Sequence, residues 1–305
     1  MPLSRRELLI LLPALAFADS SSEPHAQFPV EPRARLAVTS WPFRAYIESP
    51  TNHGRKSSVP GMDLKEFPAF VVDKFGVHNI NPLADHFNST DDVYLAAFRE
   101  AVDKAGSHVV DLGLGGRYFY DPDPTARQTA VDYGRKWIDI AVKIGSPSVR
   151  QHLQVRHGQK PDPAMAAESL RQLADYGAKR NVVVNLENDN PIAEDPFVLV
   201  SVIEKVNAPY LRALPDFGNS LGEHDEDYNE GGVKAMLAHA WNMCHVKDSV
   251  EGENGQRKNV DLARMFGLAK QSSYRGYYSM EFDTNAGDPI VGTQKLVQES
   301  LQYLA

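Results

Sequence analysis

The stretch WNMCHVKDS, residues 241–249, begins like a buried strand and ends in charged groups. The imidazole of His245, the ammonium of Lys247 and the carboxylate of Asp248 come at and just after the end of its apolar part. Burying such groups is costly unless they are paired or bound to something. The stretch therefore predicts a strand whose end belongs to a site, provided that other strands bring matching groups to the same place.

Outward from this stretch, the chain after residue 34 alternates between strand-like and helix-like segments. Apolar residues recur at helical spacing, Asp or Ser precedes helical segments, and glycine ends several of them. Eight strand–helix units favour a parallel sheet closed into a single (β/α)8 TIM barrel of the α/β class. Helices are expected over 62–76, 89–106, 123–145, 162–181, 195–207, 230–240, 260–272 and 288–304.

A doubly wound open sheet is the competing architecture. Such a sheet normally carries a glycine-rich loop after its first strand. The segment SWPFRAY, residues 40–46, lies at that place and contains no glycine. The barrel is therefore the predicted fold, and we assign residues 34–305 to it.

Four of the predicted strands end in polar residues with the same inward orientation. Residues of a barrel strand alternate between the interior and the helix layer, and the chemistry sits where the strands end. In units five to eight this alternation turns Glu187, Asp216, His245 and Glu281 inward. They are separated by 29, 29 and 36 residues, each about one unit. All four side chains are therefore expected to converge on one rim.

Polar residues that merely face water at the strand ends would explain one or two such side chains, but they explain poorly three carboxylates and one imidazole on adjacent strands. Packed carboxylates repel one another and raise each other's pKa, and a divalent cation removes the repulsion. Three oxygen ligands with one neutral nitrogen suit Mn²⁺, Mg²⁺ or Co²⁺ more than a structural zinc, and Zn²⁺ stays an alternative. We therefore predict one divalent metal, with Mn²⁺ favoured, held by Glu187, Asp216, His245 and Glu281.

The Glu–Asp–His–Glu set, the HVKD sequence at 245–248 and the eight-unit plan resemble the xylose isomerase-like superfamily of TIM barrels. That superfamily covers sugar and sugar-phosphate isomerases and epimerases, inosose dehydratases and barrels like the family 2 AP endonucleases. The resemblance covers residues 35–305. The set of four metal ligands is fairly specific to this superfamily, but it says little about the substrate.

In the ketose 3-epimerases of this group, the first and last glutamates bind the metal and move protons on opposite faces of the substrate. The resemblance gives these catalytic roles to Glu187 and Glu281, and it implies a metal-dependent carbohydrate isomerase or epimerase. The chemistry is consistent, because a metal-polarised carbonyl acidifies the adjacent C–H and a carboxylate can remove or return that proton. Those epimerases have a histidine three residues after the aspartate ligand, where this chain has Asn219.

Two other functions stay open. A metal-dependent lyase or dehydratase acting on oxo-sugars, of the 3-oxo-glycoside or inosose type, needs the same metal and base and tolerates the loss of that histidine. A sugar-binding barrel without catalysis is the second. A DNA-repair nuclease is disfavoured by the net charge of −8 and by too few histidines for a trinuclear zinc cluster.

Other residues near the strand ends are candidates for substrate binding. A basic residue there can meet a substrate oxygen or form a rim ion pair, and an aromatic ring can stack on a sugar or pack in the core. Loop tyrosines can wall the pocket or pack within their own loop. The candidates are Lys247, Arg150, His152, His86, Trp41 and Asn219, with Tyr118 and Tyr120 as the loop tyrosines.

The substrate is expected to be an uncharged small carbohydrate and not a sugar phosphate or a nucleic acid. Barrels that bind phosphate often use the loops after strands seven and eight with a helix N-terminus. Here those loops read VEGENGQRKN, 250–259, and TNAGDP, 284–289, and neither has a convincing glycine-rich cradle. Arg257 and Lys258 keep a phosphate site open as the alternative.

The N-terminus has the order of an export signal. An arginine pair at 5–6 precedes the apolar run 8–17, and Ala16-Phe17-Ala18 offers a small-x-small cleavage site. The paired arginines resemble a twin-arginine motif, and the run is too short for a membrane span. We expect residues 1–18 to be a signal peptide, 19–33 a flexible tether, and the mature protein periplasmic without a stable membrane span. The oligomeric state stays open.

Overall fold

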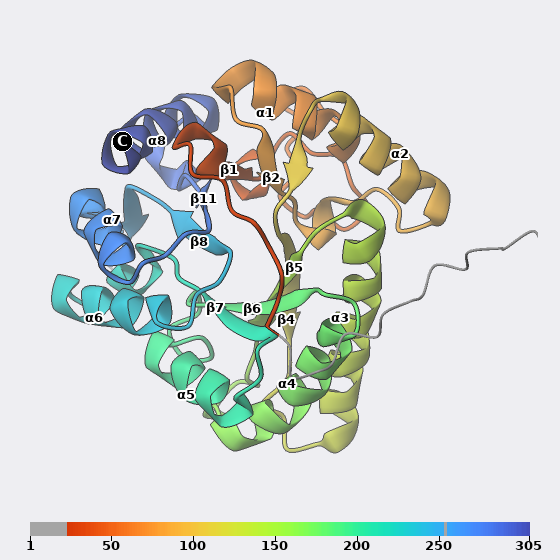
Figure 1. Ribbon diagram of the computed structural model, residues 1–305, viewed down its shortest axis with the longest axis vertical. Helices are drawn as coiled ribbons and strands as arrows, with labels where there is room; N and C mark the ends of the chain where they lie inside the picture. The colour runs from red at the N-terminus through yellow and green to blue at the C-terminus, as the bar shows by residue number, and fades with distance from the viewer. Residues whose placement is uncertain (1–22, 253–254) are drawn as a thin grey trace, which may run out of the picture.

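The computed structural model describes residues 23–252 and 255–305. Its strands form a ring, and the helices surround this ring on the outside (Figure 1). Within the described residues, eight helices alternate with the strands of the ring, so the predicted (β/α)8 barrel is confirmed. None of the described helices has the length and apolar character that crossing a membrane requires.

Parallel pairing closes the barrel. The hydrogen-bonded orders are β3-β2-β1-β11-β8 and β4-β5-β6-β7, and the bridges Leu83↔Gly113 and Asp216↔His245 join the two sheets. The first and last barrel strands are neighbours, with Leu36 opposite Tyr278. The strands are β1 (Leu36–Thr39), β2 (Asn79–Asn81), β3 (His108–Val109), β4 (Leu112–Arg117), β5 (Ser148–Leu153), β6 (Val183–Glu187), β7 (Leu211–Leu214), β8 (Met243–Val246) and β11 (Tyr277–Met280).

The strands differ from the sequence-based expectation in two places. The third predicted strand is split into β3 and β4, and Asp111 in the gap turns its carboxylate into the barrel, where Ser148, Asn185 and Asn81 donate hydrogen bonds to it. The loop after β8 contains an antiparallel hairpin, β9 (Ser249–Glu251) with β10 (Arg257–Asn259). The hairpin follows the strand that carries His245, whereas Asp111 lies deeper in the barrel, level with the start of β5.

Aspartate caps explain where most helices begin. In seven helices the residue before the first turn is Asp, and its carboxylate accepts a backbone N–H of that turn, which satisfies an otherwise unpaired donor. The helices are α1 (Phe67–Phe75), α2 (Asp92–Lys104), α3 (Pro124–Ile144), α4 (Pro163–Ala178), α5 (Pro196–Val206), α6 (Glu226–Leu237), α7 (Leu262–Gln271) and α8 (Pro289–Leu304). The sixth starts four residues earlier than expected, because Asp225 caps it.

The core has two parts, as strand alternation requires. The large part lies between the strands and the helices. A separate small cluster contains three strand residues, Ala37, Leu214 and Met243, with Val110 from the gap between β3 and β4, and it is not joined to the large part. Leu214 and Met243 have the same parity as Asp216 and His245, so they support the predicted inward orientation of the site residues.

The described part of the expected tether, residues 23–33, lies against the barrel, and the red segment crosses the ring of strands in Figure 1. The ring of Phe28 meets Trp241 and Tyr277 edge to face, with centroids 5.6 and 5.9 Å away. Both partners lie at or just before the start of a strand, so the segment covers the end of the barrel opposite to the predicted site. The expected signal peptide, 1–18, and residues 19–22 lie outside the described residues.

Candidate metal centre

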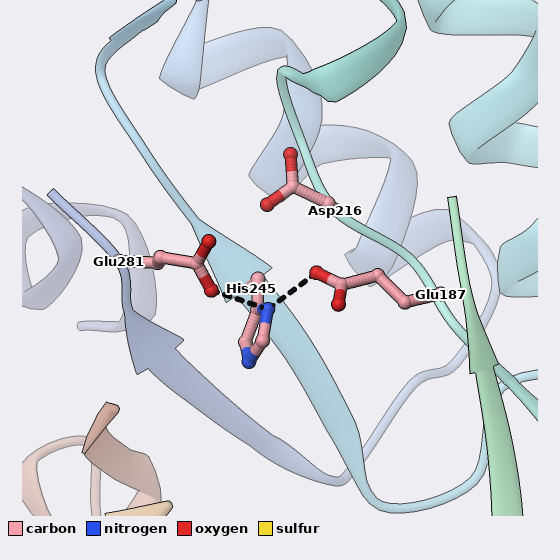
Figure 2. A group of neighbouring side chains, drawn as sticks. All are labelled: Glu187, Asp216, His245 and Glu281. Atoms are coloured by element: carbon pink, nitrogen blue, oxygen red, sulfur yellow. Dashed lines mark hydrogen bonds and ion pairs between the residues drawn. The ribbon is translucent and has the colours of Figure 1, made fainter. Parts of the chain in front are cut away.

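The four predicted metal ligands meet at one point. Glu187 ends β6, Asp216 follows β7, His245 lies in β8 and Glu281 follows β11 directly. Each offers one donor atom, and these four atoms all lie within 4.8 Å of one another. Figure 2 shows the three carboxylates pointing toward the imidazole from their separate strand ends. The strand alternation read from the sequence therefore places these side chains correctly.

His245 lies at the centre of the cluster. Its Nδ1 is 2.5 Å from Glu187 Oε1 and 2.7 Å from Glu281 Oε2, and these two contacts are the dashed lines in Figure 2. Its Nε2 is 2.9 Å from Asn81 Oδ1. The imidazole is fully buried. Because Nε2 faces an amide oxygen, Nε2 carries a proton there and Nδ1 is the nitrogen available to a metal.

Burial and charge shift the pKa values of the cluster in opposite directions. Burial alone would lower the pKa of His245, but Glu187 and Glu281 outweigh it and raise that pKa to about 10. Burial would raise the pKa of Glu187, yet His245 and Arg150 hold it at about 2. The pKa of Glu281 is lowered in the same way, by His245 and Lys247 against burial. In the chain alone, a proton on Nδ1 thus takes the position between the carboxylates that a cation would take.

Asp216 is held in place by one of its oxygens, which leaves the other for a ligand. Oδ1 accepts the backbone N–H groups of Gly218 and Asn219 at 2.8 and 2.7 Å. Oδ2 is buried and makes no hydrogen bond within the described part of the chain; Lys247 Nζ lies 3.2 Å from it. Burial raises the pKa of Asp216 to about 7, and the neighbouring carboxylates add to this effect.

These features fit a divalent metal. A buried oxygen without a hydrogen bond is costly unless it binds something. The contacts point to Glu187 Oε1, Asp216 Oδ2, His245 Nδ1 and Glu281 Oε2 as the donors, a set of three oxygens and one nitrogen that suits a hard or borderline cation. Arg150 donates to Glu187 Oε2, so the other oxygen of that carboxylate is the one turned to the cluster.

A cavity of about 460 Å³ opens above the cluster. Five of the six residues predicted to bind substrate line it: Trp41, Arg150, His152, Asn219 and Lys247. Lys247 Nζ lies 2.7 Å from Asn219 Oδ1 and 3.4 Å from Glu281 Oε1, so a cation is buried beside the metal ligands. Trp41 is 43% exposed at the cavity wall, with the Arg44 guanidinium 4.1 Å above its ring.

His86 is the predicted site residue that the structure places elsewhere. It is buried, and its Nδ1 lies 2.8 Å from the Ser40 hydroxyl, which also accepts the Leu83 backbone N–H. Burial lowers its pKa to about 3. His86 does not line the cavity, and its contacts give it a packing role. Of the two loop tyrosines, Tyr120 is buried and donates to Ala193 O.

Sequence reasoning missed a buried polar network below the cluster. Asn81 accepts from His245 Nε2 and donates through Nδ2 to Asp111 Oδ2 at 3.1 Å. Asn185 Nδ2 donates to Asp111 Oδ1, also at 3.1 Å. The inward parity of Asn81 in β2 was the available signal. Such outer hydrogen bonds orient a histidine ligand and select its tautomer.

Replacing Asn81 by leucine should lower the affinity for Mn²⁺ by about 10- to 100-fold, which is the usual cost of losing such a partner. The leucine leaves Nε2–H of His245 without an acceptor, so the imidazole loses both its orientation and its fixed tautomer. Competition with a fluorescent chelator measures the change. Asn79→Leu is the matched control, because Asn79 lies on the same strand and donates to the backbone oxygens of Ala34 and Leu36 instead.

An Asn81→Leu protein that folds and binds Mn²⁺ as tightly as the parent would show that this hydrogen bond does not orient the ligand. A loss of equal size in both variants would assign the effect to strand β2 as a whole.

The comparisons with known proteins identify the family. A family model described as xylose isomerase-like TIM barrel matches residues 71–305, so the chain belongs to that family. No curated protein matches the chain.

Three solved structures show how general the fold is. D-psicose 3-epimerase from Clostridium cellulolyticum H10, in a complex with D-tagatose, has a TM-score of 0.65 at 14% identity, covering 88% of this chain and 98% of that one. A xylose isomerase-like barrel from Mycobacterium smegmatis in complex with magnesium has a TM-score of 0.63 at 18% identity, covering 89% of this chain and 98% of that one. 3-Keto-D-glucoside 4-epimerase from E. coli has a TM-score of 0.62 at 15% identity, covering 88% of this chain and 98% of that one. At these identities the likeness establishes the fold alone.

Proposed function

We propose that the protein is a divalent-metal-dependent carbohydrate isomerase or epimerase that transfers protons next to a carbonyl group. One observation carries this proposal: Glu187 and Glu281 lie on two sides of His245 Nδ1, below a cavity of about 460 Å³. A cavity of this size suits a small molecule. Two carboxylates that approach one point from different strands can serve two faces of the same substrate.

The roles of the residues follow from their contacts. When bound, a divalent metal at the cluster supplies a Lewis acid that polarises a carbonyl. One glutamate takes the proton from the carbon next to the carbonyl, and the other returns a proton on the opposite face. Lys247 stabilises the negative charge that develops on the substrate oxygen, since its Nζ is buried at the cavity. Arg150 holds Glu187 in position.

Mn²⁺ is the ion we propose, because the donor set is mostly oxygen. The magnesium complex of the M. smegmatis barrel and the sugars in the names of the two epimerases support a metal and a carbohydrate for this chain. An uncharged sugar is favoured because Arg257 and Lys258 do not line the cavity; they bond to the backbone oxygens of Ala286 and His224. Export to the periplasm through the 1–18 signal remains part of the proposal.

A lyase acting on oxo-sugars is the second candidate, and Asn219 favours it. Its side chain is committed at both ends, accepting from Lys247 Nζ and donating to Asn188 O, and an amide cannot relay a proton. His152, in contrast, lies beside the cluster: its Nε2 contacts the Arg150 guanidinium and is 3.7 Å from Glu187, while Glu194 accepts from its Nδ1 at 2.8 Å. Burial and Arg150 lower the pKa of His152, but Glu194 and Asp189 outweigh them and raise it, which favours the protonated ring that a leaving oxygen needs.

Deuterium exchange tests the proposal. The protein purified with its metal should contain one divalent ion per chain, and in D₂O it should introduce deuterium next to the carbonyl of at least one oxo-sugar, as read by NMR. Exchange without elimination identifies the isomerase, and a product with a new double bond identifies the lyase. Metal-loaded protein that binds these sugars but exchanges no hydrogen would leave only a sugar-binding barrel.

A further inference from the structure

A second cavity of about 430 Å³ lies beside the first, over the ends of β4, β5 and β6. The two cavities share His152 and Asp189 as wall residues. His152 Nε2 is 3.7 Å from the proposed metal ligand Glu187, so the wall that the two cavities share begins next to the metal centre. We call this second space the side cavity; a molecule bound at the metal would reach it past His152 and Asp189.

Polar groups line this space, and one of them packs where a side chain on Gly116 would lie. Gly116 carries no side chain at the end of β4, and a Cβ there would lie 2.5 Å from Gln154. Tyr118 is 38% exposed at the cavity, and the guanidinium of Arg156 lies 4.8 Å from the centre of its ring. Within the described residues, neither the side-chain amide of Gln154 nor the Tyr118 hydroxyl forms a hydrogen bond, so both remain available to a ligand; the backbone N–H of Gln154 donates to Arg117 O.

The charges of the side cavity select a neutral occupant. Arg156 is paired with Asp121, and His152 with Glu194 at 2.8 Å. Asp189 is half exposed, and its nearest cation is the His152 ring at 3.7 Å. A phosphate or carboxylate here would meet the charge of Asp189 without an uncommitted arginine or lysine among the lining residues. A group rich in hydroxyls, with an aromatic edge beside it, matches the lining.

We infer that the substrate is a glycoside: the reacting sugar lies over the metal cluster, and a second neutral sugar unit lies in the side cavity against Tyr118 and Gln154. This inference rests on the proposed function, whose substrate class it narrows. A free monosaccharide would leave the side cavity filled with water. A disaccharide would use the Gln154 amide and the Tyr118 ring, which together should strengthen binding by at least about tenfold.

Titration calorimetry on the Mn²⁺-loaded protein tests the inference. The probes are matched sets: glucose with maltose and cellobiose, galactose with lactose, and xylose with xylobiose. At least one disaccharide should bind about ten times more tightly than its monosaccharide. Gln154→Trp, which fills the side cavity, should reduce that affinity to the level of the monosaccharide. Gln128→Trp is the control, because Gln128 is exposed on α3 and lines neither cavity.

Equal affinities for every disaccharide and its monosaccharide would overturn the inference. It would also be overturned if a disaccharide bound more tightly than its monosaccharide but the Gln154→Trp variant bound that disaccharide as tightly as the parent protein does. The two proposals fail separately. Preferential disaccharide binding without deuterium exchange would support the sugar site in the side cavity and contradict the isomerase function. Deuterium exchange without preferential disaccharide binding would support the isomerase function and contradict the glycoside substrate.

Discussion

Replacing Glu281 by glutamine should lower turnover at saturating metal by about 100-fold or more, because a positioned acid or base contributes about 10²- to 10⁴-fold. Glutamine keeps the shape of the side chain and one oxygen for the cluster, but it cannot take up a proton. The pKa of Glu281 is lowered by His245 and Lys247, so the carboxylate is ionised at neutral pH and ready to act as a base. Deuterium incorporation per unit time, at matched metal occupancy, measures the effect.

Folding should change much less than turnover in this variant. Lys247 keeps Asp216 and Asn219 as partners, and His245 keeps Glu187 and Asn81. Glu299→Gln is the matched control, since it removes the same charge from a surface pair with Lys295 on α8. Glu281→Gln protein that exchanges deuterium at the rate of the parent, with its metal site full, would remove Glu281 from the acid–base role.

The convergence of the four candidate metal ligands could be predicted because two regular geometries govern their positions. Strand residues alternate with a period of two, and the ends of parallel barrel strands meet on one rim. Glu187 and His245 lie on strands, and Asp216 and Glu281 follow strands within two residues, so counting along the chain was enough to bring them together. His86 is the predicted site residue for which counting along the chain failed. It lies in a 3-10 turn, Ala84–His86, where the period of two no longer holds, and the turn directs its ring into the core.

The residues that support the ligands were harder to find. The inward parity of Asn81 was one signal, but Asp111 lies between two strand segments and its partners come from three other strands, so no local pattern indicates that these residues meet. Glu194, which fixes the ring of His152, lies in a loop whose path is set by tertiary contacts. Sequence spacing predicts which regular elements meet, but it does not predict how an irregular loop turns a side chain.

Metal loading should depend steeply on pH, because protons occupy two of the four donors. The pKa of His245 is raised to about 10 by Glu187 and Glu281 against the effect of burial, so Nδ1 is protonated below pH 10 in the metal-free protein. Burial raises the pKa of Asp216 to about 7, so its carboxyl group is protonated below pH 7. The pKa values of both glutamates are lowered, so they stay ionised. A metal must therefore displace about one proton between pH 7 and 10, and about two below pH 7.

The apparent association constant for Mn²⁺ should then rise about tenfold per pH unit between pH 7 and 10, and about 100-fold per unit below pH 7. Chelator competition across pH measures both slopes, and calorimetry in buffers of different ionisation enthalpy counts the released protons directly. In the Asp216→Asn variant, the association constant below pH 7 should rise only about tenfold per pH unit, because the amide has no proton to lose. An association constant that does not change between pH 7 and 9 would show that Nδ1 is already deprotonated. The imidazolium between Glu187 and Glu281 would then be absent from the metal-free protein.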